Sequence, residues 1–332
     1  MQQGMLSSVL LLSIALLTGV PAAATTEMEP QRVEQWLQES QVHDKVSELL
    51  QYVVEDDTDG LNFALQRFAL PVQEVSRYLL LKKIEDQNLI LTPKMALFIE
   101  QQQSMVPTYQ VLERGDGYEF TVPAFNYPAI ASRLLKQWRQ DQSTLAFVLD
   151  AERGELVLKD WLTGSDYQVQ TREVLLIREL DSLSPEAVNT LAEQLTKAAV
   201  VSWLPSSQVM VRLAQVSENP DVYKLLWLMK ADFNSESELV RLAKVADNFS
   251  LVQVMQASNN PSLKERAITE LTKVRPMSNE VKEFLITRMA ASDDARFIAG
   301  ELARQGYSSW LEELASSNKT VNSRAILSVI GQ

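Results

Sequence analysis

The spacing of hydrophobic residues predicts a mostly helical chain. Between residues 28 and 54 the apolar side chains recur every three or four positions, as on one face of an α-helix (Val33, Trp36, Leu37, Val42, Val46, Leu49, Leu50 and Val53). Further helices are expected at about 61–86, from Thr92-Pro93 onward, and throughout the chain after Asp166. Threonine before proline is a typical helix start, because threonine caps free backbone N–H groups and proline fits the first turn.

The hydrophobic period changes from helical to alternating after residue 106. β-branched and aromatic residues fill Thr108–Glu113 and Tyr118–Val122, and Gly115-Asp116-Gly117 separates the two runs. Glycines allow the positive φ angles that a tight turn requires. These residues therefore predict a β-hairpin.

A second hairpin is expected beyond a short helix at residues 129–141. The apolar runs Leu145–Leu149 and Glu155–Trp161 lie on either side of Glu152-Arg153-Gly154. The segment 106–163 is thus predicted to be a small α/β module of hairpin, helix and hairpin.

A short motif recurs in the C-terminal part of the chain and predicts helix starts. Ser217-Glu218-Asn219-Pro220 and Ser258-Asn259-Asn260-Pro261 begin 41 residues apart, and Ser316-Ser317-Asn318-Lys319 begins 58 residues after the second. Asn219 and Asn260 are expected to cap the helices that follow them. The last two copies agree furthest, because the residues after them stand in register: Leu263, Arg266, Ala267, Ile268 and Leu271 with Val321, Arg324, Ala325, Ile326 and Val329.

These residues resemble HEAT-like helical repeats, in which two antiparallel helices form a unit and the units stack into a curved rod. The resemblance covers residues 205–332 and implies an α-solenoid of HEAT-like helical hairpins, with the small α/β module inserted in a mostly α chain. Such a surface is expected to hold other molecules. Arg266 and Arg324, at matching places in two copies, are the candidate partner-binding residues. The alternatives are an irregular helical domain, and arginines that only cover apolar neighbours.

The N-terminus predicts an exported protein. Leu6–Val20 is an almost unbroken apolar run that is followed by Pro21 and by Ala22-Ala23-Ala24, so signal-peptide cleavage is expected after Ala24. A retained anchor is the alternative, but the run is shorter than the roughly 18 to 20 residues of a spanning helix. We expect a periplasmic or extracellular protein. The predicted order is a signal peptide at 1–24, an N-terminal helical region at 25–105, the α/β module at 106–163, connecting helices at 164–204 and HEAT-like repeats at 205–332.

The charge of the chain narrows the class of partner. There are 43 Asp and Glu against 31 Lys and Arg, which gives a formal net charge of −12. Nucleic acids and anionic membranes attract the opposite sign, so neither is expected as a partner. The expected partner is a protein or peptide, for which a basic surface is the better electrostatic match. The oligomeric state stays open.

No motif assigns a catalytic, cofactor-binding or metal-ligating residue. The chain has no cysteine, which excludes disulfides and thiolate chemistry. The acidic stretch with Glu55, Asp57 and Asp59 follows part of the spacing of a calcium loop, but Gln66 stands where a bidentate carboxylate is needed, so a loop between helices is expected. The only histidine, His43, is expected on a solvent-exposed helix face.

Six tryptophans offer aromatic surface. Trp36, Trp138, Trp227 and Trp310 lie on apolar helix stripes, which predicts packing in a core. Trp161 is expected at a strand end, where it would be partly exposed.

We therefore expect an exported binding or scaffold protein without a cofactor. Two alternatives remain. One is an envelope hydrolase that uses carboxylates or serine near the α/β module, because two carboxyl groups suffice for glycoside cleavage. The other is a structural subunit of an envelope complex, in which an unmated final helix at 320–330 docks on a partner.

Overall fold

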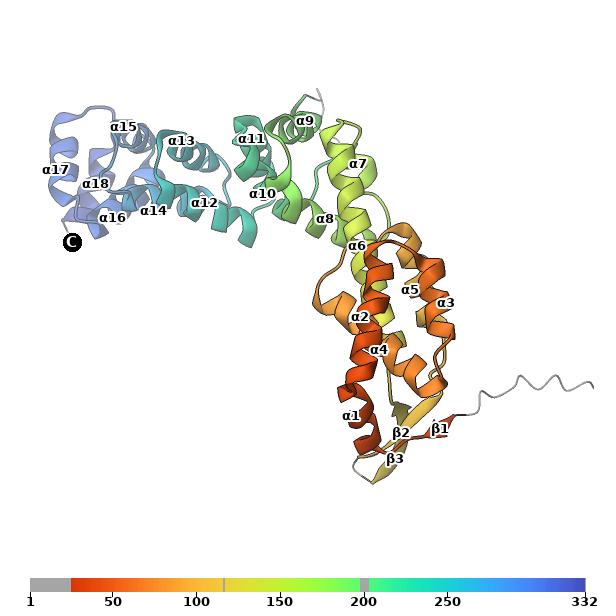
Figure 1. Ribbon diagram of the computed structural model, residues 1–332. Coiled ribbons are helices and arrows are strands. Elements are labelled where there is room, and N and C mark those ends of the chain that lie inside the picture. The colour runs from red at the N-terminus through yellow and green to blue at the C-terminus, as the bar shows by residue number, and fades with distance from the viewer. Residues whose placement is uncertain (1–24, 116, 198–202, 332) are drawn as a thin grey trace, which may run out of the picture. The chain divides into compact units, whose positions relative to one another are not determined.

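The structure is a computed structural model that describes residues 25–115, 117–197 and 203–331. These residues are mostly helical, with one small three-stranded sheet, so the prediction of a mostly α chain is confirmed (Figure 1). Within these ranges, no helix is long and apolar enough to cross a membrane. The expected signal peptide at 1–24 lies outside the described residues.

The chain divides between Gln142 and Ser143 into two compact units, and each has its own hydrophobic core. The division falls inside helix α6 (Tyr127–Glu152). The first unit holds the sheet and five helices before α6: α1 (Pro30–Gln38), α2 (Ser40–Val54), α3 (Thr58–Gln66), α4 (Leu70–Asp86) and α5 (Pro93–Ser104).

Local capping explains where several of these helices begin. The Thr92 side chain accepts a hydrogen bond from the backbone N–H of Met95 at 3.0 Å, and Pro93 opens α5 as predicted. The expected first helix is instead two helices that part at Glu39, where the backbone is extended. His43 bridges this break, since its Nε2 lies 2.8 Å from the Leu37 carbonyl oxygen. It is half-buried, so the prediction of an exposed histidine was wrong.

The sheet contains the first predicted hairpin. Strands β2 (Tyr109–Gly115) and β3 (Tyr118–Pro123) pair antiparallel, and the short strand β1 (Thr26–Glu27) pairs parallel with β2. A buried carboxylate on α4 anchors the start of β2, because Glu74 accepts hydrogen bonds from the backbone N–H groups of Thr108 and Tyr109 at 2.6 and 3.3 Å. The pKa of Tyr127 is raised to about 12, mainly because the side chain is buried and also because Glu74 carries a negative charge.

The second predicted hairpin does not form. Residues 145–149 belong to α6, and the segment 155–161 contains the short helix α7 (Leu158–Trp161). The run around residue 147 is apolar throughout, so its period was ambiguous. Packing favours a helix, because Phe147 and Ala151, four residues apart, are buried while Leu145 and Leu149 are exposed.

The second unit continues with helices that follow one another closely. They are α8 (Asp166–Glu179), the 3-10 helix η1 (Leu180–Ser182), α9 (Pro185–Thr196), α10 (Ser207–Ser217), α11 (Pro220–Leu228), α12 (Phe233–Val245), α13 (Asn248–Ala257), α14 (Lys264–Lys273), α15 (Asn279–Arg288), α16 (Ser292–Arg304), α17 (Ser308–Ser317) and α18 (Ser323–Ile330). Helices α8, α10, α12, α14, α16 and α18 each contact the next member of this set, which we name the even row. Helices α9, α11, α13 and α15 do the same and form the odd row, as Figure 1 shows.

Asn219 caps α11 as predicted, but Asn260 does not cap α14, which begins at Lys264 after Leu263, and the 41-residue interval of the motif is not a structural period. Asn219, Asn260 and Asn318 each accept a hydrogen bond from the backbone N–H two residues later, at 2.8 to 2.9 Å. The first copy precedes α11 in the odd row, whereas the other two precede α14 and α18 in the even row. The 58-residue interval therefore spans two pairs of helices. The final helix also has a mate, because α18 packs on α16 and α17.

A shorter interval recurs along the even row. Glu238-Leu239-Val240-Arg241, Glu270-Leu271-Thr272-Lys273 and Glu301-Leu302-Ala303-Arg304 lie on α12, α14 and α16, 32 and then 31 residues apart. In each copy the leucine is fully buried, and the glutamate is buried and pairs with the basic residue three positions later. One pair of helices thus occupies about 31 residues.

Candidate functional site

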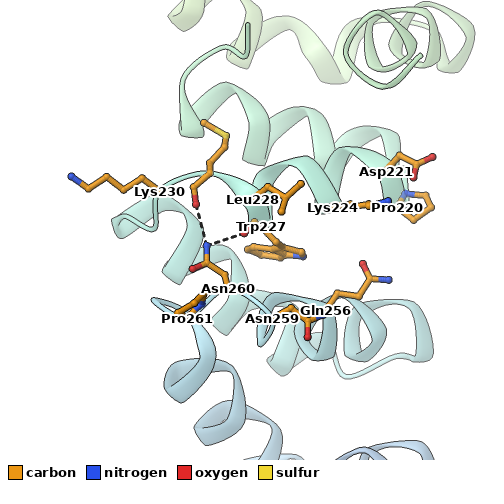
Figure 2. A pocket seen from close by; sticks show the side chains of 11 residues that line it. Pro220, Asp221, Lys224, Trp227, Leu228, Lys230, Gln256, Asn259, Asn260 and Pro261 are labelled. Atoms are coloured by element: carbon orange, nitrogen blue, oxygen red, sulfur yellow. Dashed lines mark hydrogen bonds between the residues drawn. The ribbon is translucent and has the colours of Figure 1, made fainter. Parts of the chain in front are cut away.

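A groove opens along the odd row between α11 and the connection from α13 to α14 (Figure 2). Its volume is about 740 Å³, which lies in the range of sites that hold small ligands or peptide segments. Both asparagine-proline motifs border it. The lining residues are Pro220, Asp221, Lys224, Trp227, Leu228, Met229, Lys230, Gln256, Asn259, Asn260 and Pro261.

The apolar part of the groove combines a rigid wall with an exposed side chain. Trp227 is only 4% exposed, and its ring stacks on Tyr223 with the centroids 5.9 Å apart. The next residue, Leu228, is 74% exposed. Single exposed leucines are common on protein surfaces, but this one lies in a groove beside an immobilised aromatic ring. It can serve as the contact point for an apolar side chain of a ligand.

A hydrogen-bond network behind the wall holds Tyr223 in place. Its hydroxyl donates to Glu238 of α12 at 2.8 Å, and Arg241 donates to both oxygens of the same carboxylate at 2.7 Å. Gln215 of α10 donates to it at 2.6 Å. Burial and the neighbouring Glu238 raise the pKa of Tyr223, and hydrogen bonding to Glu238 raises the pKa of Arg241. Three consecutive helices are therefore connected through one carboxylate.

Asn260 holds the two sides of the groove together. Its side-chain amide donates to the carbonyl oxygens of Trp227 and Met229 at 2.8 and 3.1 Å, and Figure 2 shows both bonds. These carbonyls lie at the C-terminal end of α11, where backbone carbonyl groups have no hydrogen-bond partner within the helix. The Asn260 side-chain oxygen meanwhile accepts from the backbone N–H of Ser262 at 2.9 Å.

Asn259 and Gln256 offer polar groups next to the apolar wall. Arg288 of α15 donates to the side-chain oxygen of Asn259 at 2.6 Å, which orients that amide and leaves its NH₂ group as a donor. Lys224, Lys230 and Asp221 complete the rim and are exposed. The groove therefore presents apolar contact, amide hydrogen bonds and a small excess of positive charge.

A second hollow, of about 470 Å³, lies along the even row between α12 and α14. We name it the basic hollow, after Lys244, Arg266, Lys273 and Arg275, which line it together with Glu270. Its remaining lining is apolar (Val240, Ala243, Ala246 and Val274). Arg266 and Arg324 are both exposed, but Arg324 of α18 is not among the residues that line this hollow. The hollow therefore does not join the two predicted arginines.

A third hollow, of about 360 Å³, lies near the N-terminal end of the second unit. Phe147, Trp161 and Tyr167 line it together with Arg172, whose guanidinium lies 5.9 Å from the Trp161 ring centroid. Trp161 is half-buried on α7, not at a strand end. No aspartate or glutamate is buried among the described residues of 106–170.

The remaining candidates belong to the framework. Asp57 caps α3 by accepting from the backbone N–H of Gly60 at 2.9 Å, so the acidic stretch is a turn into a helix that begins at Thr58. In the described ranges, no group of three or more His, Cys, Asp or Glu residues is placed to hold a metal ion. The tryptophans predicted for the core pack there (Trp36, Trp138, Trp227 and Trp310).

Comparisons with known proteins return no family model, no curated protein and no solved structure that matches this chain. The groove residues were not among the predicted site residues. A sequence signal was present, since Leu225-Leu226-Trp227-Leu228 is a run of four apolar residues in a helix. A helix rotates by about 100° per residue, so such a run cannot bury every side chain on one face.

Proposed function

We propose that this is an exported binding or scaffold protein, in the periplasm or outside the cell, whose residues 205–332 form an α-solenoid of HEAT-like helical hairpins. Two rows of helices, each in contact with its next member, support this architecture. So does the return of a buried glutamate and leucine every 31 or 32 residues along the even row. Helical units that bury their apolar faces against neighbours leave an extended surface for binding.

The groove between α11 and the α13–α14 connection is the proposed binding site for a protein or peptide partner. The exposed Leu228 beside the fixed ring of Trp227 is the observation on which this proposal rests. An extended peptide needs hydrogen-bond partners for its backbone and pockets for some of its side chains. The amides of Gln256 and Asn259 can bond to the peptide backbone, and the apolar wall can contact a peptide side chain.

The proposed cleavage after Ala24 would keep every residue of the described sheet. Its first strand begins at Thr26, which donates its backbone N–H to the Thr108 carbonyl oxygen at 2.8 Å.

Site-specific photo-crosslinking in the native cell envelope tests the binding site. A photoreactive residue replaces Leu228 in the full chain, and a matched one replaces Leu327, a 51% exposed leucine of α18. A discrete adduct is expected from position 228 and not from position 327. The crosslinked protein is then purified and its affinity for the chain is measured.

The substitution Leu228→Asp is expected to weaken that affinity about tenfold to a hundredfold, because burying one leucine side chain contributes about 1.5 to 3 kcal/mol. Leu327→Asp is the matched control and is expected to bind like the wild type. Equal adducts from both positions, or an unchanged affinity of Leu228→Asp, would show that the groove is not the binding site.

A further inference from the structure

The basic hollow is a separate feature of the second unit and shares no lining residue with the groove. It lies between helices of the even row, whereas the groove is lined by the odd row and its connections. Four cationic side chains and a single carboxylate line it, in a chain whose formal net charge is −12. This local excess of positive charge favours an anionic ligand.

The cations are held in place by the protein. Glu270 is 7% exposed, and its Oε1 lies 2.9 Å from Lys273 Nζ and 3.3 Å from Arg266 Nε. One carboxylate thus positions two cations but neutralises only one charge. Because both side chains are already ordered, a ligand would lose less conformational entropy in binding them.

Arg275 is fixed even more firmly. Its guanidinium donates to the carbonyl oxygens of Thr272, Val274 and Gln305 at 2.8 to 2.9 Å and lies 4.5 Å from the ring centroid of Tyr307. It contributes a fixed positive charge to the hollow and has few donors left for a ligand. Lys244, in the last turn of α12, is exposed and makes no ion pair or hydrogen bond among the described residues. It is the cation that is free to bind directly.

The apolar lining distinguishes between classes of anion. Val240, Ala243, Ala246 and Val274 offer van der Waals contact but no hydrogen bonds from their side chains. A compact ion such as phosphate would gain nothing from them and would be repelled by the carboxylate of Glu270. A ligand with an apolar group flanked by separate carboxylates would match both the lining and the spread of the cations.

We propose that the basic hollow binds an acidic polypeptide segment in which Asp or Glu side chains flank an apolar one. A volume of about 470 Å³ suits a few residues of such a segment. A nucleic acid would carry its charges over a much greater length and would be repelled by the acidic remainder of the chain. The net charge of the chain favours a basic partner at long range, but salt screens that field beyond about 8 to 10 Å. At shorter range the cations of the hollow therefore determine which charge a ligand must carry.

Fluorescence anisotropy on the full chain tests the proposal. The probe is a labelled twelve-residue synthetic peptide that alternates Glu with Leu, and the comparison peptide carries Lys in place of Glu. Binding of the acidic peptide is expected at low salt and is expected to weaken as salt is raised. The Lys peptide is expected to bind at least tenfold more weakly.

Substitution locates the site. The double variant Lys244→Gln with Arg266→Gln is expected to weaken binding of the acidic peptide about fivefold to twentyfold, since each exposed charge contact contributes modestly. Arg296→Gln removes one exposed arginine of α16 outside the hollow and is expected to change affinity less than twofold. Leu228→Asp is expected to leave binding of this peptide unchanged, which separates the hollow from the groove. If the double variant melts early, Lys244→Gln alone provides the comparison.

Three results would overturn the proposal. The first is no binding of the acidic peptide at low salt. The second is equal weakening by Arg296→Gln, which would indicate a nonspecific charge effect. The third is tighter binding of inorganic phosphate or of a twelve-nucleotide single-stranded oligonucleotide than of the peptide, which would assign the hollow to a different ligand.

Discussion

Replacing Glu238 by glutamine tests whether one buried carboxylate holds α10, α11 and α12 together. Glu238 is 2% exposed and accepts four hydrogen bonds, from Tyr223, Gln215 and both donating nitrogens of Arg241. An amide keeps one oxygen as acceptor but turns its NH₂ group toward donors. Part of the network must therefore lose its partner.

The expected loss follows from the exposure of the partners. A hydrogen bond to a charged group contributes about 1.5 to 3 kcal/mol, and a buried donor without a partner costs about 1 to 3 kcal/mol. The Tyr223 hydroxyl is buried and cannot turn to water, whereas the Arg241 side chain is 43% exposed and can. We therefore expect Glu238→Gln to lower the free energy of unfolding by about 3 kcal/mol, at the lower end of the range of about 3 to 5 kcal/mol for breaking a fully buried pair.

Differential scanning calorimetry of the full chain measures this effect. The transition of the second unit is expected to fall by about 6 to 12 °C, because 1 kcal/mol shifts the Tm of a unit of this size by roughly 2 to 4 °C. The control is Glu236→Gln, the same change two residues away on the exposed side of α12. It removes a favourable charge from the first turn and is expected to cost less than about 1 kcal/mol.

A double-mutant cycle with Tyr223→Phe sharpens the result. The phenylalanine removes the buried donor, so the two substitutions together are expected to cost less than the sum of the single ones. If Glu238→Gln destabilised the chain no more than Glu236→Gln, or if the cycle showed no coupling, Glu238 would not connect these helices.

Two further predictions concern single side chains. Tyr127, with a pKa of about 12, is expected to ionise later than ordinary tyrosines in an absorbance titration; because its pKa is raised in the folded state, its contribution to stability is complete below about pH 10 and is lost as the pH rises toward 12. Early ionisation of every tyrosine in the folded protein would contradict this. Asn260→Ala removes two hydrogen bonds to the end of α11 and one to Ser262, so we expect about 1 to 2 kcal/mol of destabilisation and faster amide hydrogen exchange at Ser262. Exchange at wild-type rates would show that Asn260 does not hold the connection closed.

Much of the secondary structure followed from local signals in the sequence. Ser184 and Ser278 are residues of a type that often caps helices, and their side chains accept hydrogen bonds from the backbone N–H three residues later at the starts of α9 and α15. The spacing of Ser235 and Glu238 in the sequence is typical of a capping box, but that box does not form. Asp232 caps α12 and forms the box with Ser235, because Glu238 points into the network around Arg241 and Tyr223. A local pattern cannot show that a distant partner claims a side chain.

The repeated motif shows the same limit on a larger scale. Asn219 and Asn260 make the same local hydrogen bond, yet one precedes a helix of the odd row and the other a helix of the even row. The Glu-Leu pairs mark the structural repeat better than the asparagine motif does. Because buried glutamates are uncommon, however, the glutamate of such a pair is expected on the surface until its burial is known. The exposure of Leu228 likewise depends on which face of α11 meets its neighbours.

The sequence by itself determined that this chain is mostly helical, where several helices begin, that one hairpin lies near residue 115 and that the chain has no cysteine for thiol chemistry. These properties depend on contacts between residues close in the chain or on composition alone. The tertiary structure alone decided that residues 145–149 are helical, that Arg266 faces a hollow and Arg324 does not, and that Trp227 and Leu228 line a groove. Those outcomes depend on which helices pack together, and that depends on side chains tens of residues apart.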